Sequence, residues 1–413
     1  MHLWFPAVPR ERFWSSMKKE FLIQLHSLTV FRNLLKDPVI EALCEYLKDL
    51  GNRDPLLAVS GYCQTVGKLY LSGESNFADY IQRIVNDDEN VYIQSIGQGK
   101  KPAPFMKEAV LKELEILQQI ADLTPQKLRA DLSYDGYLPA FEAKQLRLAE
   151  EYSHRCANVH RYGYGMYASF CMFYVNTEGR ITPVHSPDSI RLSELIDYKR
   201  EQQLILDNTN ALLEGKPAAN ILLTGDAGTG KSSTIKAVVN ELYDRGLRII
   251  EIRKEQLHAI PAIVDELSKN PLKFILFIDD LSFVKDDDNF SALKAILEGS
   301  VSAKSGNVVI YATSNRRHLV KEKFSDRDDD DVHRNDTMQE IISLSERFGL
   351  QITFNRPDKK TYLNIVSHLA EENGIQIPEE ELFAGAERFV LSRGNRSARA
   401  AKQYVDSLLV EKN

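Results

Sequence analysis

The stretch from Ile221 to Lys236, ILLTGDAGTGKSSTIK, decides the fold of this chain. It places a glycine-rich segment, Gly225 to Ser232, between an apolar run and an amphipathic run. This order predicts a buried strand, a phosphate-binding loop and a helix, the arrangement called a P-loop. Backbone N–H groups at the helix start bind phosphates, and glycine permits the close approach of backbone to ligand. We therefore expect the chain to bind a nucleoside triphosphate.

Two residues of this loop have defined expected roles. Lys231 would reach the β- and γ-phosphates, and the Ser232 hydroxyl would provide one ligand of a magnesium ion. The remaining residues that we expect to contact the nucleotide here are Gly225, Asp226, Ala227, Gly228, Thr229, Gly230 and Ser233.

Length and composition limit the classes of protein that fit. A chain of 413 residues allows for about two or three domains. Its net charge of −7 argues against a generic DNA-coating protein, although a local basic patch is possible. The four cysteines are scattered, with no CxxC pair, which supports neither a disulfide framework nor a zinc site. No apolar stretch is long enough to span a bilayer, and we expect a cytoplasmic protein without membrane association.

The first half of the chain reads as mostly helical. Residues 1–16, MHLWFPAVPRERFWSS, are expected to be a non-native or flexible leader, with Met17 as the natural start; an aromatic anchor packed on the body is the alternative. Residues 17–189 are expected to form a helical domain that also holds a small β-hairpin within 164–184. The expected helices are two within 18–50, broken at Asp37-Pro38, and others at 56–72, 76–86, 105–120 and 138–152.

From about residue 190 apolar strands alternate with helices, the pattern of a parallel sheet covered by helices. We expect an α/β core at 190–356 with a five-stranded parallel sheet, followed by an all-helical lid at 357–413. The expected strands are 220–224, 247–252, 273–278, 307–312 and 350–354. The expected helices are 198–214, 231–244, 255–269, 289–298, 336–346, 358–373, 378–391 and 396–411.

Polar residues follow two of these apolar strands. Asp279 and Asp280 come directly after strand 273–278, and Asn315 follows strand 307–312. Phosphoryl transfer depends on charge neutralisation and on an aligned water molecule. We expect Asp279 to hold the magnesium ion, Asp280 to polarise the attacking water, and Asn315 to orient that water.

Three arginines are further candidates. Arg347 precedes the fifth strand, where it would reach the γ-phosphate of a neighbouring subunit in a ring or filament more easily than its own. A surface or structural role is the alternative for Arg347. Arg396 and Arg399 lie near the start of the last helix, and we expect one of them, Arg399 in the first instance, to fold over the phosphates.

From about Ile190 to its C-terminus the chain resembles an AAA+ ATPase. Gly225 to Ser232 matches the Walker A motif of that family, and Asp279-Asp280 matches its Walker B motif. Asn315 corresponds to sensor 1, Arg347 to the arginine finger and Ser397-Ala398-Arg399 to sensor 2. The resemblance therefore implies ATP-dependent work by an oligomer.

The segment Leu195-Ile196-Asp197-Tyr198 is similar to the part of an AAA+ protein that contacts adenine. This similarity implies ATP in place of GTP, with Ile196 and Tyr198 as contacts of the base. More closely, the motifs GDAGTGKSS, DDLSF, YATSNRRHL and SERFGL resemble a bacterial family of predicted ATPases known as domain of unknown function 815. That resemblance covers most of the chain, is weakest in the helical N-terminal region, excludes the first 16 residues and names no substrate.

One residue departs from the family pattern. Many AAA+ proteins have Asp-Glu at the Walker B motif, whereas this chain has Asp279-Asp280. The aspartate side chain is shorter, and misplacement of a catalytic group by about 1 Å lowers a rate by about 100-fold. We expect ATP hydrolysis to be slow or stimulated by a partner.

The sequence favours an ATP-driven conformational switch that forms a homo-oligomer when ATP is bound and remodels or loads an unidentified macromolecular partner. The first alternative is a nucleotide-regulated protein-binding module with little hydrolysis. The second is a DNA-associated ATPase similar to helicase loaders, based on the basic residues of the lid; the acidic composition and the absence of a recognisable DNA-reading domain argue against it. A small-molecule kinase fits least, because no acceptor-pocket pattern accompanies the P-loop.

Overall fold

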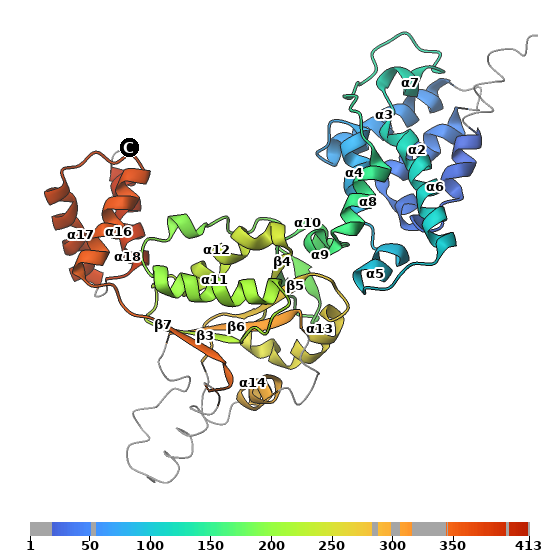
Figure 1. The fold of residues 1–413 in the computed structure, drawn as a ribbon. Helices are drawn as coiled ribbons and strands as arrows, with labels where there is room; N and C mark the ends of the chain where they lie inside the picture. The colour runs from blue at the N-terminus through green and yellow to red at the C-terminus, as the bar shows by residue number, and fades with distance from the viewer. Residues whose placement is uncertain are drawn as a thin grey trace, which may run out of the picture. The chain divides into compact units, whose positions relative to one another are not determined.

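The computed structural model describes residues 19–50, 55–282, 288–298, 306–315, 344, 346–393 and 396–411. The chain divides into two compact units, the first ending at Ser169 and the second beginning at Phe170 (Figure 1). The expected leader and nearly all of the expected helix 336–346 lie outside the described residues. Among the described helices, none combines the length and the apolar character that crossing a membrane requires.

The first unit is helical. Residues 19–26 are helical, and a short 3-10 helix, η1, spans Arg32–Lys36. The helices that follow are α2 (Pro38–Asp49), α3 (Pro55–Leu71), α4 (Phe77–Asp87), α5 (Val91–Gly97), α6 (Pro104–Ala121), α7 (Pro125–Arg129), α8 (Leu148–Ala157), α9 (Val159–Tyr162) and α10 (Met166–Ser169). The helix expected at 138–152 begins instead at Leu148, because the segment before it is held in extended form by tertiary bonds. The Glu142 N–H donates to the Ser75 carbonyl (2.8 Å), and the Tyr62 hydroxyl donates to the Pro139 carbonyl (2.6 Å).

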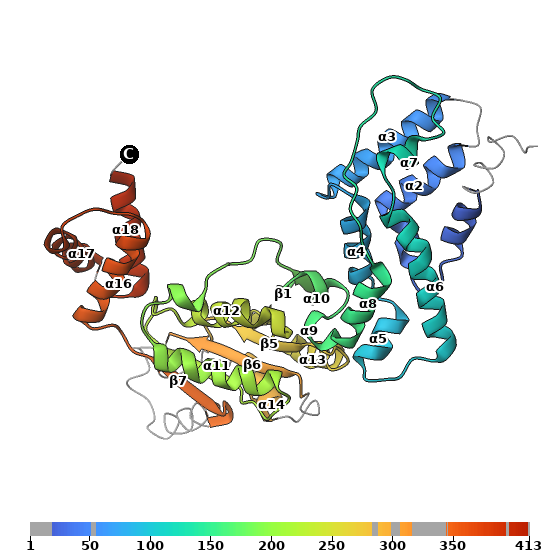
Figure 2. The ribbon, with the colours of Figure 1, turned by 45° about the horizontal axis from the view of Figure 1, so that its top comes forward.

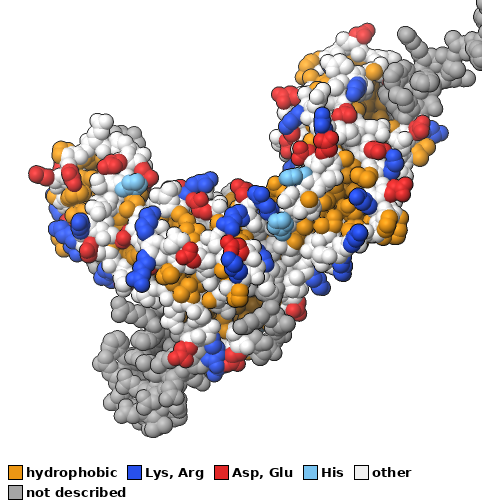
Figure 3. Space-filling model, in the orientation of Figure 1, with side chains coloured by type: hydrophobic (Ala, Val, Ile, Leu, Met, Phe, Trp, Pro, Cys, Tyr) orange, Lys and Arg blue, Asp and Glu red, His pale blue; other side chains and the backbone are white. Residues whose placement is uncertain are grey.

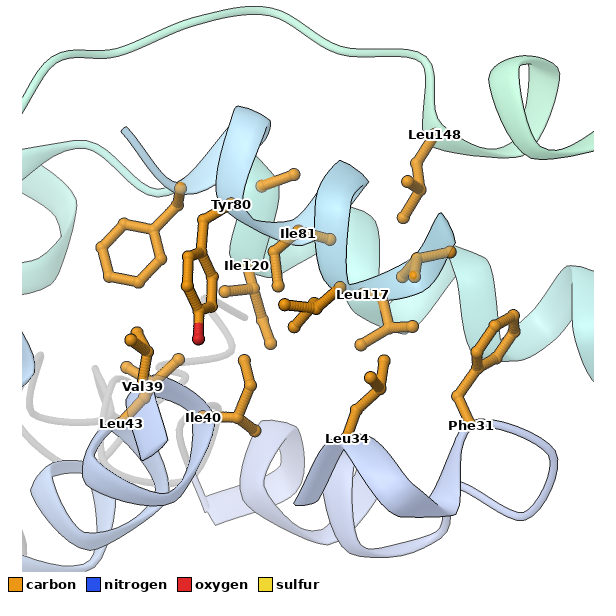
Figure 4. Packing of buried hydrophobic residues seen from close by; sticks show 14 of the residues in the cluster. Phe31, Leu34, Val39, Ile40, Leu43, Tyr80, Ile81, Leu117, Ile120 and Leu148 are labelled. Carbon is orange, nitrogen blue, oxygen red and sulfur yellow. The ribbon is translucent and has the colours of Figure 1, made fainter. Parts of the chain in front are cut away.

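Helices α2, α4 and α6 enclose the apolar core of the first unit. Figure 4 shows the buried side chains of this core converging from the three helices: Val39, Ile40, Leu43, Tyr80, Ile81, Leu117 and Ile120. The break expected at Asp37-Pro38 has a clear cause. The Asp37 carboxylate caps α2 by accepting the N–H groups of Val39 (3.0 Å) and Ile40 (3.2 Å), and Pro38 occupies the first helical position.

The second unit is built on a seven-stranded sheet with the order β2-β1-β4-β5-β6-β3-β7. The strands are β1 (Met172–Val175), β2 (Ile181–Pro183), β3 (Ile221–Gly225), β4 (Leu247–Glu251), β5 (Lys273–Ile278), β6 (Val308–Ser314) and β7 (Leu350–Phe354). Only the pair β1-β2 is antiparallel; the other neighbouring pairs are parallel. The five parallel strands β4-β5-β6-β3-β7 are those that the sequence predicts, and they form the core of the sheet.

The β-hairpin formed by β1 and β2 lies in the second unit, whereas its sequence position predicts it in the N-terminal domain. β1 extends the sheet by pairing with β4, with Met172 opposite Ile249. A two-stranded hairpin is only marginally stable alone, and pairing with β4 buries its apolar residues and covers an open strand edge. The amide of Gln256 also donates to the carbonyls of Val175 (3.0 Å) and Asn176 (2.8 Å).

Helices cover both faces of the sheet (Figure 1). On one face α11 (Lys199–Leu213) and α12 (Lys231–Leu242) share a buried apolar cluster with alternate strand residues such as Leu223 and Phe277. The intervening strand residues, among them Leu222 and Leu276, point to the opposite face, where α13 (Ile260–Leu267) and α14 (Asp288–Glu298) lie. Burial on both faces explains why the parallel strands are almost continuously apolar.

Three helices after β7 form the lid that the sequence predicts. They are α16 (Lys359–Glu372), α17 (Glu379–Arg393) and α18 (Ala398–Glu411), gathered into a small bundle in Figure 2. Buried residues from the three helices, including Tyr362, Ala386 and Val405, give this bundle an apolar core of its own.

The end of β3 approaches β7 closely at Gly225. Its φ is +134°, and a Cβ at this position would lie 2.0 Å from the Phe354 carbonyl oxygen. Both the backbone conformation and the contact therefore require glycine.

We predict that Gly225→Ala lowers the free energy of unfolding by about 2–3 kcal/mol, because the backbone must move or remain strained. The matched control is Gly306→Ala, since a Cβ at Gly306 would meet nothing within 4 Å. Thermal unfolding of both full-length variants, followed by circular dichroism, provides the comparison. Equal melting temperatures for the two variants would contradict the close approach of β3 and β7.

Candidate functional site

A cavity of about 840 Å³ opens in the second unit where β3, β5 and β6 end. Parallel α/β sheets bind ligands at the carboxyl ends of their strands, because loops and helix N-termini meet there. The cavity is lined by loop residues Ala227 to Thr234, by Asp279, Asp280, Thr313 and Asn315, by residues of the segment 188–198, and by lid residues including Ile365, Leu369, Arg399 and Lys402. The structure thus brings most of the expected site residues together.

The glycine-rich loop contacts the start of the last lid helix. Gly228 has φ +78°, and a Cβ there would lie 3.1 Å from both the Ser397 Oγ and the Arg399 Cβ. The Arg399 N–H donates to the Gly228 carbonyl at 3.3 Å. Gly230, also left-handed, is the N-cap residue directly before α12. Glycine at position 228 therefore leaves room for loop and lid to meet.

Lys231 is buried at the centre of the site, with 5% of its surface exposed. Its Nζ donates to the carbonyls of Gly225 (2.9 Å) and Asp226 (2.8 Å) and to the Asn315 Oδ1 (3.0 Å). Burial lowers the pKa of the ammonium group, while the nearby carboxylates, Asp279 foremost, act in the opposite direction. Additional negative charge in the cavity would favour the charged form further.

One oxygen of Asp279 accepts three hydrogen bonds. Its Oδ1 receives the Ser232 hydroxyl (2.6 Å), the Thr313 hydroxyl (2.5 Å) and the Asp280 N–H (3.2 Å). These donors come from α12, from β6 and from the segment after β5. The carboxylate is therefore fixed relative to the phosphate-binding loop.

Asp280 has an unusual backbone conformation. Its φ is +53°, in the left-handed region that non-glycine residues seldom adopt. Its N–H donates to the Thr313 Oγ1 (2.9 Å), and its Oδ1 accepts from the Asn315 Nδ2 (2.7 Å). A continuous set of hydrogen bonds thus runs from Lys231 through Asn315 to Asp280.

The oxygen atoms at this edge of the sheet suit a magnesium ion. Mg²⁺ prefers oxygen ligands and is commonly held by one or two carboxylates together with phosphates and water. The Ser232 hydroxyl and the Asp279 carboxylate, which are hydrogen-bonded to one another, form such a pair. Within the described ranges no group of three or more His, Cys, Asp or Glu side chains could hold a metal by itself. A metal here would therefore depend on oxygens brought by a ligand.

The expected base-contacting residues lie at another wall of the cavity. Ile196 and Tyr198 both line it. The Tyr198 hydroxyl donates to the Asn355 carbonyl (2.5 Å), and its ring centroid lies 4.9 Å from that of Phe354. Ile196 packs against the apolar core of the lid. The segment therefore connects the sheet to the lid beside the cavity.

The structure distinguishes the two lid arginines. Arg399 lines the cavity, whereas Arg396 is absent from its lining. The Arg396 guanidinium forms a two-pronged ion pair with Glu387, at 3.1 and 2.9 Å, inside the lid. Of the pair, Arg399 is the residue placed to meet a ligand, and contact of Arg396 with a nucleotide stays a prediction.

Arg347 also lies outside the cavity lining. Its Nη2 contacts the Glu298 Oε1 on α14 at 2.5 Å. About a quarter of the Arg347 side chain, 27%, is exposed. A role of Arg347 at the site of a neighbouring subunit stays a prediction.

Two residues of the site were not identified from the sequence as site residues. Thr313 bonds both Walker-type aspartates, and Arg356 lies 3.3 Å from the Asp226 Oδ1 of the phosphate-binding loop. Thr313 and Arg356 lie near the phosphate-binding loop because β6 and β7 are the two strands that flank β3. With this strand order known, polar residues at the ends of β6 and β7 are expected to reach the loop that follows β3.

A protein-family model described as "Protein of unknown function (DUF815)" matches residues 168–412. The match begins where the second unit begins and does not extend over the helical first unit.

Two solved structures are distantly similar. The RuvB Holliday junction branch migration motor of Thermotoga maritima is 17% identical with a TM-score of 0.35, over 54% of this chain and 66% of that chain. C. elegans PCH-2 is 17% identical with a TM-score of 0.37, over 51% of this chain and 63% of that chain. This chain thus covers less than two thirds of either protein. Both TM-scores are low, so these likenesses add nothing to the fold that the strand order defines.

We predict that Thr313→Val weakens the apparent magnesium affinity of the site by about 10- to 100-fold, as loss of a residue that orients a metal ligand commonly does. The measurement is a magnesium titration of ATP binding. Thr313→Ser keeps the hydroxyl and should retain the affinity. Thr209→Val is the matched control, because its buried hydroxyl also has two partners, the Ile205 carbonyl (2.7 Å) and the Tyr311 hydroxyl (2.9 Å). An equal effect of both valine substitutions would show that Thr313 is merely structural.

Proposed function

The chain belongs to the DUF815 protein family, and we propose that it is a magnesium-dependent ATPase whose cycle drives a conformational change acting on a macromolecular partner. The observation that carries the proposal is the meeting of three groups in one cavity: the glycine-rich loop with Lys231, the bonded pair Ser232 and Asp279, and the pair Asp280 and Asn315. P-loop nucleoside triphosphatases need these three functions, which are phosphate binding, metal binding and orientation of water.

In this proposal the triphosphate lies along residues 225–233. Backbone N–H groups of the loop and the start of α12 bind its oxygens, and the Lys231 ammonium neutralises charge on the β- and γ-phosphates. Lys231 is already held in the loop by two carbonyls, so little ordering of its side chain is needed when a ligand binds. Arg399, on the lid side of the cavity, adds a second positive charge.

Magnesium would be held by Ser232 and Asp279, and when bound it would neutralise negative charge on the β- and γ-phosphate oxygens. The chain's own contribution is to fix both ligands in advance. The Asp279 carboxylate has its orientation set by three donors to Oδ1. The second oxygen, Oδ2, is the one that we assign to the metal or to its bound water.

Asp280 and Asn315 would act on the water that attacks the γ-phosphate. The Asp280 carboxylate accepts a proton from that water or polarises it, and Asn315 orients it. In the structure these two side chains bond each other at 2.7 Å. A carboxylate has two oxygens, so Asp280 can keep this bond at Oδ1 and meet the attacking water with Oδ2. Slow hydrolysis that a partner accelerates stays part of the proposal because the aspartate side chain is short for this position.

Arg347 supports assembly into a homo-oligomer. It lies outside the cavity lining of its own subunit and bonds Glu298 on α14. An arginine supplied by a neighbouring subunit stabilises transition-state charge and raises phosphoryl-transfer rates by about 10³–10⁵-fold. We assign Arg347 this role, with Glu298 holding it at the surface until a neighbour binds.

The base-side wall supports a nucleobase in the cavity, and ATP as the particular nucleotide is what the resemblance of residues 195–198 implies. Ile196 and Tyr198 stand in the same cavity as the apolar lid residues Ile365 and Leu369. A flat aromatic base fits between such surfaces, and closure of the lid on the base would couple nucleotide binding to lid position.

A nucleotide-regulated binding module is the second candidate function. The first unit has an apolar core of its own and lies outside the family match, which suits a separate recognition domain for a protein partner. In this alternative ATP binding moves the lid, and hydrolysis is rare.

A DNA-associated activity has less support. Of the basic lid residues, Arg396 pairs with Glu387, and Arg399 and Lys402 line the cavity. Over the described residues on the face drawn in Figure 3, Lys and Arg side chains are interspersed with Asp and Glu. Proteins that bind nucleic acid through their backbone phosphates generally present a continuous basic surface.

We predict that Asp280→Asn and Arg347→Ala each lose ATPase activity while still binding ATP. If Arg347 acts on the neighbour's site, an equimolar mixture of the two variants should regain about a quarter of wild-type activity. The reason is that an Arg347→Ala subunit keeps Asp280 and can receive Arg347 from an Asp280→Asn neighbour. A phosphate-release assay of each variant and of the mixture measures this.

Asp265→Asn is the control, because Asp265 is an exposed carboxylate on α13 and lies outside the cavity lining. Its activity should equal that of the wild type. Full activity of both site variants would reject the roles assigned to Asp280 and Arg347. No measurable phosphate release by the wild type would reject the ATPase proposal in favour of the binding module. Loss in each variant without recovery in the mixture would reject the role of Arg347 between subunits.

A further inference from the structure

The strained backbone of this protein is concentrated in one place. Among the described residues, the non-glycine residues with positive φ are Asp197 (+91°), Tyr198 (+59°) and Asp280 (+53°). All three line the cavity of the candidate site. Left-handed conformations cost non-glycine residues free energy and persist only where surrounding contacts maintain them. The two consecutive strained residues, Asp197 and Tyr198, therefore need a structural cause.

Gln202 supplies that cause. It lies in the first turns of α11 with 4% of its surface exposed. Its Nε2 donates to the carbonyls of Leu195 (3.2 Å) and Asp197 (3.0 Å). An amide nitrogen carries two hydrogens, so both donors are used on this one turn. The Gln202 Oε1 in turn accepts from the Lys199 Nζ at 3.4 Å. The side chain thus closes the turn from Leu195 to Tyr198 against the helix that follows it.

The other side of the turn is fixed by β7 and the residue after it. The Tyr198 hydroxyl bonds the Asn355 carbonyl, and its ring packs on Phe354. The hydroxyl end of Tyr198 is therefore held by the residue after β7, while Gln202 holds the backbone carbonyls of the turn that precedes Tyr198. Between these two attachments Ile196 and Tyr198 line the cavity, as the lid residues Ile365 and Leu369 also do.

We propose that Gln202 is the positioning residue for nucleobase recognition: its amide clamps the strained turn 195–198 in the shape that contacts the base. This inference rests on the proposed function. It adds a buried residue, Gln202, that acts through the turn and does not itself contact the base. Without the two bonds from Gln202, the left-handed turn relaxes, and Ile196 and Tyr198 leave their places. The phosphate-binding loop is held by other contacts, among them those of Lys231, and keeps its shape.

The proposal separates binding of the base from binding of the phosphates, and the two can be measured apart. The probes are ATP and inorganic tripolyphosphate, each with magnesium, titrated calorimetrically into the full-length protein. Gln202→Met keeps the size of the side chain and removes both donors. It should weaken ATP binding by about tenfold, the factor expected for the loss of one or two hydrogen bonds, and change tripolyphosphate binding by less than about twofold.

Gln203→Met is the matched control, since Gln203 is the next residue on the same helix, is exposed, and bonds only the Asp207 carboxylate (2.7 Å) among the contacts described. It should bind both probes as the wild type does. Equal weakening of both probes by Gln202→Met would show a general structural role and overturn the proposal. Unchanged ATP binding would overturn it as well.

If Gln202→Met does not fold, Asp197→Val decides the matter, because a β-branched residue is strongly disfavoured at φ +91°. A loss of affinity for ATP alone in Asp197→Val supports the proposal. An equal loss of affinity for ATP and tripolyphosphate rejects it, and so does unchanged affinity for both. A wild-type protein that binds neither probe rejects the proposed function itself. A wild-type protein that binds ATP and tripolyphosphate equally well rejects only the assignment of a base-reading turn.

Discussion

A single carboxylate oxygen, the Asp279 Oδ1, joins the parts of the site. It accepts hydrogen bonds from Ser232 at the start of α12 and from Thr313 near the end of β6, while Asp279 itself follows β5. These elements lie far apart in the sequence and meet only because β6 is inserted between β3 and β5 in the sheet. If Asp279 holds a metal ion as we propose, a carboxylate fixed in this way needs no rearrangement when a nucleotide arrives, which is the physical meaning of a preorganised site. The rest of the account, from Lys231 to the lid, depends on this convergence.

The same cavity collects backbone strain. Asp280, which we propose to activate water, is left-handed, and so are Asp197 and Tyr198 in the segment that we propose to contact the base. Each is held by a buried polar side chain, Thr313 in the first case and Gln202 in the second. Strain at both ends of one ligand site indicates that the backbone shape there serves binding at the expense of stability. Asn355 and Arg356, which follow β7 and lead to the lid, touch the base-side turn and the phosphate-binding loop respectively, so both ends of the site are connected to the lid.

The sequence predicted local features well and pairings less well. The apolar runs before Asp279 and Ser314 predicted β5 and β6, and the spacing of the glycines predicted the loop and α12. These signals are local in the sequence, so they can be read without knowing the fold. The β-hairpin was recognised but assigned to the wrong unit, because the choice of β4 as its neighbour leaves no trace in the hairpin's own residues. Thr313 and Arg356 were missed for the same reason. The sequence does not show that Arg396 pairs with Glu387, because this ion pair depends on how α17 packs in the lid. The different placement of Arg396 and Arg399 is therefore visible only in the structure. The extended segment before α8 was predicted as helix because its tertiary bonds outweigh its helical pattern.

The central claim is that the loop from Gly225 to Ser233 binds a triphosphate through the buried ammonium of Lys231. Calorimetric titration of ATP with magnesium into the wild type and into Lys231→Ala tests it most directly, with circular dichroism to show that both proteins are folded. The account predicts saturable binding by the wild type and a loss of affinity of about a hundredfold in the variant, because a buried charge-assisted contact is removed. Unchanged affinity in a folded Lys231→Ala protein would contradict it.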